Sequence, residues 1–267
     1  MTMPSAVWRD VVRIREAAPL VHNITNYVVM NTTANALLAI GASPVMAHAI
    51  DEVEDMVRLA GALVINIGTL SPAWVDAMVR AGREASRIGI PVVLDPVGAG
   101  ATRYRTDTAQ ELGRDVSPAI IRGNASEIRA LAQADATTRG VDSTHSTEES
   151  VDQARRVAGQ YQCTVSMSGA TDIIVSRDAT VRVDNGHPLM PRVTGLGCTA
   201  TALTGAFAAV NPSAFDAAVH AMIVMGIAGE IAAERATGPG SFWVQFLDAL
   251  YGLQESDITT RMRASDR

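Results

Sequence analysis

The stretch Arg192-Val-Thr-Gly-Leu-Gly-Cys-Thr-Ala200 joins a predicted strand and turn to a long apolar run, residues 201–210. Gly195 and Gly197 allow a tight turn and let a ligand come close to the backbone. Unpaired amides and the positive end of a helix dipole meet at a helix start, so the amides of residues 195–198 suit an anion such as phosphate. Cys198 lies in the same turn, where we expect the dipole to favour its thiolate.

Two other interpretations of this turn exist. It can be an ordinary Gly-containing connection between two elements, because short Gly patterns are common. It also fits the dinucleotide fingerprint G-x-G-x-x-A, which requires an acidic residue at the end of a second strand about 20 residues further on. Asp216 has roughly that spacing, but it lies where the sequence predicts a helix start. The dinucleotide interpretation is therefore set aside.

The composition limits the chemistry. The chain has 267 residues, 48% of them hydrophobic, and a net charge of −6 without any basic block. Nucleic-acid and membrane-surface binding are therefore not expected. The sequence has no lysine, which excludes a P-loop and a Schiff-base mechanism. An enzyme of this composition that acts on phosphates must use arginine, backbone amides and metal.

The cysteines and the N-terminal segment indicate where the protein works. Cys163 and Cys198 do not suggest a disulfide framework. Residues 1–18 carry five charged side chains and no apolar signal core. No apolar stretch is long and clean enough to cross a bilayer. We therefore expect a soluble, cytoplasmic protein.

Strands and helices are predicted to alternate along the chain. The predicted strands are residues 19–22, 42–46, 62–67, 90–94, 119–122 and 163–167, followed by an antiparallel hairpin, 172–176 and 180–184. The predicted helices are residues 7–17, 28–40, 71–88, 150–161, 198–209, 215–236 and 241–254, a short one that starts in the acidic run 51–55, and one that ends at residue 132. Residues 138–149 are predicted as a loop and the polar tail from Glu255 as frayed. This order implies a three-layer α/β/α fold with a mainly parallel sheet, as a single domain over residues 1–267.

Ligands of such sheets bind beyond the carboxyl ends of the strands. The polar, sulfur-containing and Gly positions predicted at those ends are Asn26, Met46, Gly68, Asp95, Arg122, Ser168 and the turn 195–198. Their common location is a stronger signal than any single motif.

Each candidate also has a purely structural explanation. Met46 at a strand end is more often part of a core, and the Asn/Thr-rich residues 23–27 can be a capping loop. Asp95 can be a turn residue. Glu127 can simply occupy the first turn of a helix that Asn124 or Ser126 caps. The five histidines show no metal-ligand spacing.

Five segments in order make the sequence resemble the hydroxyethylthiazole kinases of thiamine salvage, in the ribokinase-like superfamily, from about residue 19 to 252. They are His22-Asn-Ile-Thr-Asn-Tyr-Val28, Ile65-Asn-Ile-Gly-Thr69, Leu94-Asp-Pro-Val-Gly-Ala-Gly-Ala-Thr102, Arg122-Gly-Asn-Ala-Ser-Glu127 and Val193-Thr-Gly-Leu-Gly-Cys198. The resemblance implies a ribokinase-like fold without a separate lid domain. It also implies transfer of a phosphoryl group from ATP, with Mg²⁺, to the hydroxyl of 4-methyl-5-(2-hydroxyethyl)thiazole.

The resemblance also implies roles for individual residues. Met46 and Gly195 contact the thiazole, and we add Asn26 and Gly68 to the substrate side. Arg122 and Ser168 contact ATP, and we add Thr194 and Gly197. Glu127 and Asp95 serve Mg²⁺, and Cys198 stands where many superfamily members carry the catalytic aspartate. The family forms trimers with the thiazole site between subunits. Leu196 departs from the family, which commonly has threonine there, so any hydroxyl contact is lost while the amide remains.

Two alternatives remain open at this point. The chain can be a kinase of the same fold that acts on another small alcohol, such as the hydroxymethylpyrimidine of the same pathway. It can also be a non-catalytic ligand-binding module. ATP consumption with each alcohol distinguishes the three.

Overall fold

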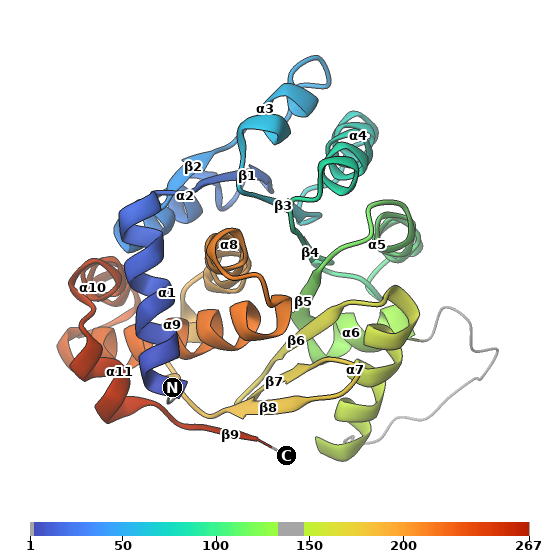
Figure 1. Ribbon diagram of the computed structural model, residues 1–267. Helices are drawn as coiled ribbons and strands as arrows, with labels where there is room; N and C mark the ends of the chain where they lie inside the picture. Colours follow the sequence, from blue (N-terminus) through green and yellow to red (C-terminus); the bar gives the residue numbers. More distant parts are fainter. Residues whose placement is uncertain (1–2, 133–146, 267) are drawn as a thin grey trace.

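The computed structural model describes residues 3–132 and 147–266, whose strands form one nine-stranded sheet (Figure 1). The strand order is β2-β1-β3-β4-β5-β6-β7-β8-β9. Strands β1 to β6 are parallel to one another, and β7, β8 and β9 each pair antiparallel with the strand before them. The bounds are β1 Leu20–Ile24, β2 Ser43–Val45, β3 Ala62–Asn66, β4 Val92–Asp95, β5 Ile120–Asn124, β6 Thr164–Ser168, β7 Asp172–Val175, β8 Thr180–Val183 and β9 Ala264–Asp266. The predicted mainly parallel sheet and the antiparallel hairpin are confirmed.

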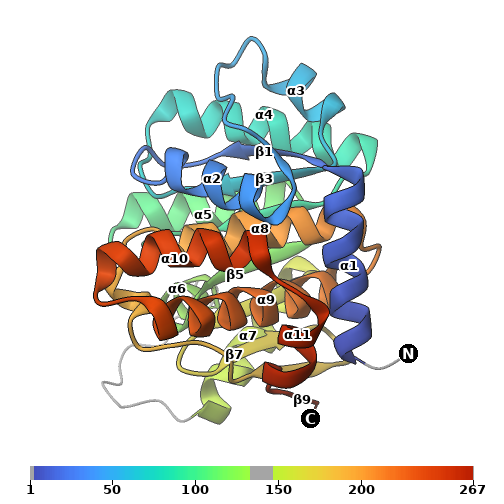
Figure 2. The same ribbon diagram turned by 90° about the vertical axis from the view of Figure 1, so that its left-hand side faces the viewer.

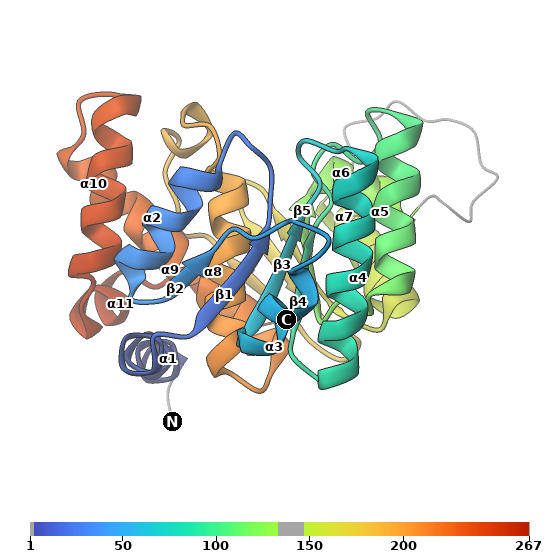
Figure 3. The same cartoon turned by 90° about the horizontal axis from the view of Figure 1, so that it is seen from above.

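Helices cover both faces of the sheet and complete the three layers (Figure 3). One face carries α1 Met3–Ala17, α2 Met30–Ile40, α8 Leu196–Val210, α9 Ala214–Arg235, α10 Pro239–Gly252 and α11 Glu255–Arg261. The other carries α3 Val53–Leu59, α4 Pro72–Ile88, α5 Arg103–Asp115, α6 Ala125–Ala132 and α7 Thr147–Tyr161. The described strands form no second sheet that could belong to a lid.

The central strands are buried on both faces, which explains their unbroken apolar sequences. In β3, Val64 packs into the core beneath α8, while Leu63 and Ile65 pack into the core beneath α4. Strand side chains alternate between faces, so a strand between two helical layers needs apolar residues at every position. The predicted strand 62–67 is confirmed for this reason.

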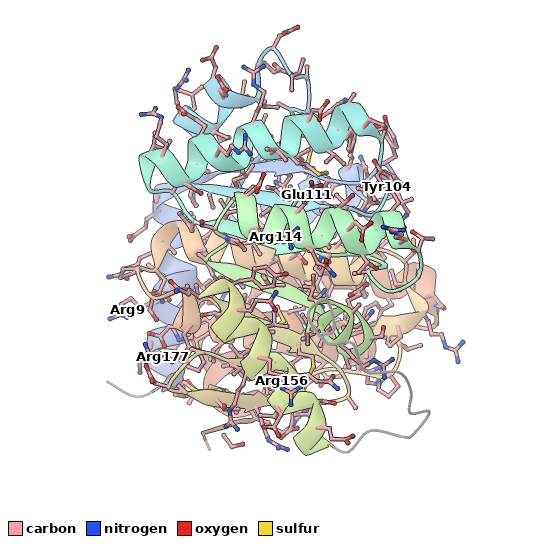
Figure 4. All side chains as sticks on the ribbon, turned by 90° about the vertical axis from the view of Figure 1, so that its right-hand side faces the viewer. Arg9, Tyr104, Glu111, Arg114, Arg156 and Arg177 are labelled. Atoms are coloured by element: carbon pink, nitrogen blue, oxygen red, sulfur yellow. The ribbon has the colours of Figure 1, made fainter. Side chains whose placement is uncertain are left out.

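Helix α5, Arg103–Asp115, was not predicted from the sequence. On its buried face, Leu112 is the one large apolar residue beside Thr108, Ala109 and Gly113, so the helix gives little apolar periodicity. Figure 4 labels Glu111 and Arg114, which are exposed on its outer side. Close packing against neighbouring elements stabilises α5 although the apolar pattern of its sequence is weak. At Gly113 any side chain would collide with the Tyr161 ring.

The frayed C-terminal tail predicted from Glu255 is wrong. Residues 255–261 form α11, whose Ile258 is fully buried, and β9 then pairs antiparallel with β8. Figure 2 shows this segment packed across the ends of α1 and α9. The polar composition of the tail did not indicate that one of its residues, Ile258, is buried or that its last residues pair with the edge of the sheet at β8. The predicted loop 138–149 lies mostly outside the described residues, and its last three residues belong to α7.

Contrary to the expectation that no apolar stretch could cross a bilayer, helix α9 is long and apolar enough to do so by length and composition alone. However, 78% of its most apolar window is buried inside the protein, between the sheet and the neighbouring helices. Its apolar character is therefore explained by its position as a core helix. No other described helix has that length and composition.

Candidate functional site

The turn before α8 presents unpaired amides. Gly195 adopts a left-handed conformation, with φ 85°, and a side chain there would collide with Val29. The first helical hydrogen bond joins the Thr199 amide to the Gly195 carbonyl at 2.8 Å. The amides of residues 196–198 have no acceptor among the described residues. Leu196 buries its side chain in the core, so only its backbone faces this site.

Arg122, on β5, reaches the same turn. Its Nη1 donates to the Gly197 carbonyl at 2.8 Å, and its side chain is nearly buried. Its Nε is buried without a hydrogen-bond partner among the described residues. A buried, charged donor with an unused N–H indicates a missing acceptor. Together with the free amides, it indicates an anion site.

A cavity of about 1090 Å³ opens beside this anion site, beyond the ends of β5 and β6. This volume accommodates a nucleotide-sized ligand. Four of the residues predicted to bind ATP line it, namely Arg122, Ser168, Thr194 and Gly197, and so does Gly195. Met222, Met225 and Ala200 supply an apolar wall. The cavity therefore combines charged and apolar surfaces.

Cys198 faces away from that cavity, toward the loop after β1. Its Sγ accepts a hydrogen bond from Asn26 Nδ2 at 3.4 Å. The same Nδ2 also donates to Asn66 Oδ1 at 2.8 Å. Asn26 packs so closely on Gly68 that a side chain at position 68 would lie 2.5 Å from its amide nitrogen. The predicted residues Asn26, Gly68 and Cys198 thus come together, from the loop after β1, the loop after β3 and the first turn of α8.

Asp95, at the end of β4, is buried behind this cluster. Its Oδ2 accepts hydrogen bonds from Asn66 Nδ2 at 2.8 Å and from Thr201 Oγ1 at 2.6 Å. Burial raises its pKa to about 6, and the negative charge of Glu127 adds to this, while the charge of Arg122 and the bonds from Thr201 and Asn66 oppose it. Its Oδ1 receives no hydrogen bond from the described residues.

The expected ionisation of Cys198 is not supported. Burial and the nearby Asp95 carboxylate raise its pKa to about 11, although hydrogen bonds from Asn66 and Asn26 and the charge of Arg122 oppose the increase. The thiol is therefore protonated at neutral pH in the absence of ligands. A helix start alone does not lower a cysteine pKa when the sulfur is desolvated beside a carboxylate.

Glu127 has the structural role that was weighed as an alternative. Its Oε2 accepts from the Asn124 amide at 2.8 Å, and Asn124 Oδ1 accepts from the Glu127 amide at 3.0 Å. This reciprocal pair caps α6. Its Oε1 accepts from the Gly98 amide at 2.9 Å, which ties the loop after β4 to α6. Each carboxylate oxygen keeps a second lone pair.

The remaining predicted residues lie at the same edge of the sheet. Met46 follows β2 directly, is half-buried, and offers its carbonyl to His48 Nδ1 at 3.4 Å. No polar contact links it to the Cys198 cluster. Ser168, at the end of β6, donates to the Gly123 carbonyl at 3.4 Å. Thr194 is exposed on the rim of the cavity.

Two residues of the cluster, Asn66 and Thr201, were not predicted as site residues. Asn66 is a polar residue at the end of an apolar strand, a signal that the sequence does contain. Thr201 lies in the second turn of an apolar helix, where a threonine looks like core. Only the fold shows that its hydroxyl reaches Asp95.

Two carboxylates, those of Asp95 and Glu127, could supply part of the coordination of a divalent cation. Mg²⁺ takes one or two carboxylates together with waters and phosphate oxygens. Asp95 has an unused oxygen, and the mutual repulsion of Asp95 and Glu127 is a reason for a cation between them. The described residues contain no group of three or more His, Cys, Asp or Glu side chains that could hold a metal by themselves. The two carboxylates therefore fit an ion whose coordination is completed by water and phosphate.

Comparison with known proteins gives consistent matches over nearly the whole chain. The model of the hydroxyethylthiazole kinase family matches residues 11–256. The chain is 62% identical over 261 residues to a hydroxyethylthiazole kinase of Syntrophus aciditrophicus, with 97% of each covered. It is 56% identical over 258 residues to that of Oleidesulfovibrio alaskensis, also with 97% of each covered.

Comparison with solved structures agrees with these sequence matches. The hydroxyethylthiazole kinase protein from Pyrococcus horikoshii OT3 superposes with a TM-score of 0.92 at 46% identity, covering 98% of this chain and 99% of that one. A ribokinase-like superfamily protein from Enterococcus faecalis has a TM-score of 0.66 at 13% identity, covering 91% and 89%, which shows the fold alone. With the family model, the sequence identities and the superposition in agreement, the chain belongs to the hydroxyethylthiazole kinase family.

Proposed function

We propose that the chain, as a single kinase domain, transfers the γ-phosphoryl group of ATP to the hydroxyl of 4-methyl-5-(2-hydroxyethyl)thiazole, for the salvage of thiamine. The observation that carries the proposal is the position of the turn before α8. On one side, Gly197 and Arg122 line the nucleotide-sized cavity, and on the other, Cys198 contacts Asn26 beside Gly68. A phosphate donor and an alcohol therefore have separate sites on either side of one helix start.

Binding of ATP is supported by complementary groups. The free amides of residues 196–198 and the unused Nε of Arg122 suit the phosphates. Met222 and Met225 offer an apolar surface for the base. Phosphoryl transfer depends on positioning and on neutralising charge more than on covalent chemistry. We place the reaction in the cytoplasm, where ATP is available.

Asp95 and Glu127 would hold Mg²⁺, mainly through water, because both Glu127 oxygens already accept backbone amides. Mg²⁺ bound there supplies positive charge that offsets the phosphates and the two carboxylates. Asn26 orients the Cys198 sulfur, and Cys198 accepts the proton of the alcohol. In a loose transition state the hydroxyl loses this proton late. Cys198 can accept it only as a thiolate, so the proton of the thiol must first pass to solvent, and Mg²⁺ beside Asp95 would favour that step by offsetting the carboxylate charge.

A homotrimer with the thiazole site between subunits is part of the proposal. It rests on the family resemblance and on one surface feature. Tyr27 and Val28, directly after Asn26, are 65% and 61% exposed. Large apolar side chains exposed beside a binding loop are typical of a surface that is covered by a partner. Met46 and Gly195 would then contribute to the thiazole site from one subunit.

ATP consumption, measured side by side with the thiazole alcohol, with hydroxymethylpyrimidine and without an acceptor, tests the function. We expect consumption only with the thiazole alcohol, and the phosphate ester should appear by mass spectrometry. Preferential consumption with hydroxymethylpyrimidine would assign the other alcohol. Tight binding of the thiazole alcohol without any turnover would indicate a binding module.

A further inference from the structure

Asn66, the last residue of β3, occupies the centre of the site. Its side chain is only 1% exposed, so each of its polar atoms needs a partner inside the protein. In the parallel sheet it lies directly beside Asp95 of β4. The loop that carries Asn26 follows the neighbouring strand on the other side, β1. Asn66 is therefore placed between the two halves of the site.

The orientation of the Asn66 amide is determined by a backbone group. The Gly68 amide donates to Asn66 Oδ1 at 2.9 Å. A backbone N–H cannot accept a hydrogen bond, so the oxygen must face Gly68 and the nitrogen must face Asp95. The Val28 amide orients Asn26 in the same way, through a 3.1 Å bond to Asn26 Oδ1. Both side-chain nitrogens are thus directed into the site.

These oriented amides connect the reacting groups. Asn66 Nδ2 donates to Asp95 Oδ2 at 2.8 Å. Asn66 Oδ1 accepts from Asn26 Nδ2, which in turn donates to Cys198 Sγ. One amide therefore contacts the carboxylate, the substrate-side asparagine and the Gly68 loop, and it is linked to the thiol through Asn26. Hydrogen bonds to the ionised form of a group favour that form.

We propose that Asn66 is a positioning residue for phosphoryl transfer, whose amide holds Asp95, Cys198 and the Asn26–Gly68 pair in one fixed arrangement. The proposal rests on the proposed function of Cys198 as the base that accepts the alcohol proton. Loss of the amide should leave ATP binding nearly unchanged, because Asn66 does not line the nucleotide cavity. It should reduce turnover and the reactivity of the thiol.

Asn66→Asp is the sharpest variant because it has the same shape. It keeps an oxygen for the Gly68 and Asn26 donors, and it replaces the donor that faces Asp95 by a second carboxylate oxygen. Asn66→Ser removes most of the amide and serves if Asn66→Asp does not fold. Asn23→Ser is the matched control, since Asn23 is equally buried on the adjacent strand and, among the described residues, donates only to the Val21 carbonyl.

Two measurements test whether Asn66 is a positioning residue. For both Asn66 variants we expect kcat to fall at least about 10-fold, with the KM for ATP within about 2-fold, since the hydrogen bond to the Asp95 carboxylate is lost and bonds to charged groups are among the stronger ones. Alkylation of Cys198 by iodoacetamide at fixed pH, followed by peptide mass spectrometry, should slow by a similar factor because the thiolate is the reactive form. Asn23→Ser should leave both rates unchanged.

Wild-type alkylation rates and kcat in a folded Asn66 variant would overturn the proposal, as would equal losses in Asn23→Ser. The alkylation rate requires neither ATP nor an alcohol. It therefore still reports on Asn66 if the wild-type protein phosphorylates neither alcohol, an outcome that would instead refute the proposed function.

Discussion

At the scale of single residues, Cys198 shows how a local motif and its surroundings can act in opposite directions. The helix start favours a thiolate, but burial and Asp95 raise the pKa of the thiol to about 11. Asn66, Asn26 and Arg122 counteract this in part. The proposed base must lose its own proton before it can accept that of the alcohol, so the groups that favour the thiolate would determine how well Cys198 serves.

Cys198→Ala tests that role. We expect the variant to fold, to bind both substrates and to lose roughly 10- to 100-fold in kcat, which is below or at the bottom of the range for general-base catalysis, because positioning carries most of the rate. Cys198→Asp should stay active, since a carboxylate can accept the same proton. Steady-state kinetics give the comparison.

The opposing hypothesis is a nucleophilic Cys198 that is itself phosphorylated. It predicts an inactive Asp variant and a phosphate on Cys198 after quenching the enzyme with ATP alone. Either result, in protein that folds and binds its substrates, would refute the general-base role.

Glu127→Gln tests the metal role. We expect a lower kcat and a higher Mg²⁺ requirement, and calorimetry should show weaker Mg²⁺ binding. The variant should fold with somewhat lower stability, because its amide nitrogen must face one of two backbone donors, at a cost of about 1–3 kcal/mol. Glu111→Gln is the control, because Glu111 is exposed on the outer side of α5. An unchanged Mg²⁺ dependence would limit Glu127 to capping α6.

At the scale of elements, α1 is attached to α9 by a buried hydrogen bond between Asp10 and His220. Asp10 Oδ2 lies 2.7 Å from His220 Nδ1 and also accepts from Asn211. Burial raises the Asp10 pKa, but the hydrogen bonds from His220 and Asn211 outweigh it, and the pKa is lowered. A carboxyl whose pKa is lowered by folding stabilises the fold above its unfolded pKa. That contribution is lost as the pH falls through the folded value.

Asp10→Ala should therefore destabilise the protein by about 3–5 kcal/mol, because it leaves His220 and Asn211 buried without their acceptor. Arg13→Ala is the control, since Arg13 is a half-exposed partner of the same carboxylate and should contribute less than about 1 kcal/mol. Urea unfolding at pH 7 gives both values. Equal effects of the two substitutions would contradict the assignment.

The C-terminal elements support the wall of the nucleotide cavity. Asn185 lines the cavity, and its side chain bonds to the Arg261 carbonyl at 2.8 Å and to the Arg263 amide at 2.8 Å. Glu230 accepts from the Gly186 amide and from Arg263 Nη2. The segment that looked frayed in the sequence thus connects α9 to the cavity.

Deletion of residues 262–267 should raise the KM for ATP several-fold, with a smaller effect on the KM for the alcohol, because the loop at Asn185 loses its support. Arg261→Ala is the control, since that side chain pairs with Glu234 on the surface. Fluorescence titration with ATP checks binding directly. Unchanged ATP affinity in the deletion variant would show that the segment only closes the sheet edge.

At the scale of the whole molecule, the proposed trimer predicts that activity depends on assembly. Sedimentation should give a trimer, and dilution to monomers should abolish turnover. Val28→Asp should dissociate the trimer, because it places a charge in the apolar surface beside Asn26. Ile88→Asp is the control, since Ile88 ends α4 at the opposite edge of the sheet. A fully active monomer would refute the shared site.

Much of the fold follows from the sequence. Apolar runs such as residues 62–67 predicted buried parallel strands, because such strands need apolar residues on both faces. The glycine turn before α8 was recognisable, because its φ of 85° at Gly195 is a conformation that few other residues adopt. Helix α5 was missed because it is held by close packing on a small buried face, which leaves no periodic signal in the sequence. The C-terminal strand was missed because it is held by pairing with the edge strand β8, which leaves none either.

It was also predictable that the candidate site residues lie at one edge of the sheet, because parallel strands bring their carboxyl ends to one edge whatever their order. The connections within it were not. Thr201, Asn66 and Asn26 come from α8, β3 and the loop after β1, yet their side chains meet around Asp95 and Cys198. The sequence by itself determined which chemical groups stand at the sheet edge. Only the tertiary structure decided their hydrogen bonds and burial, and therefore the pKa of Cys198, because desolvation and hydrogen bonding depend on neighbours distant in the chain.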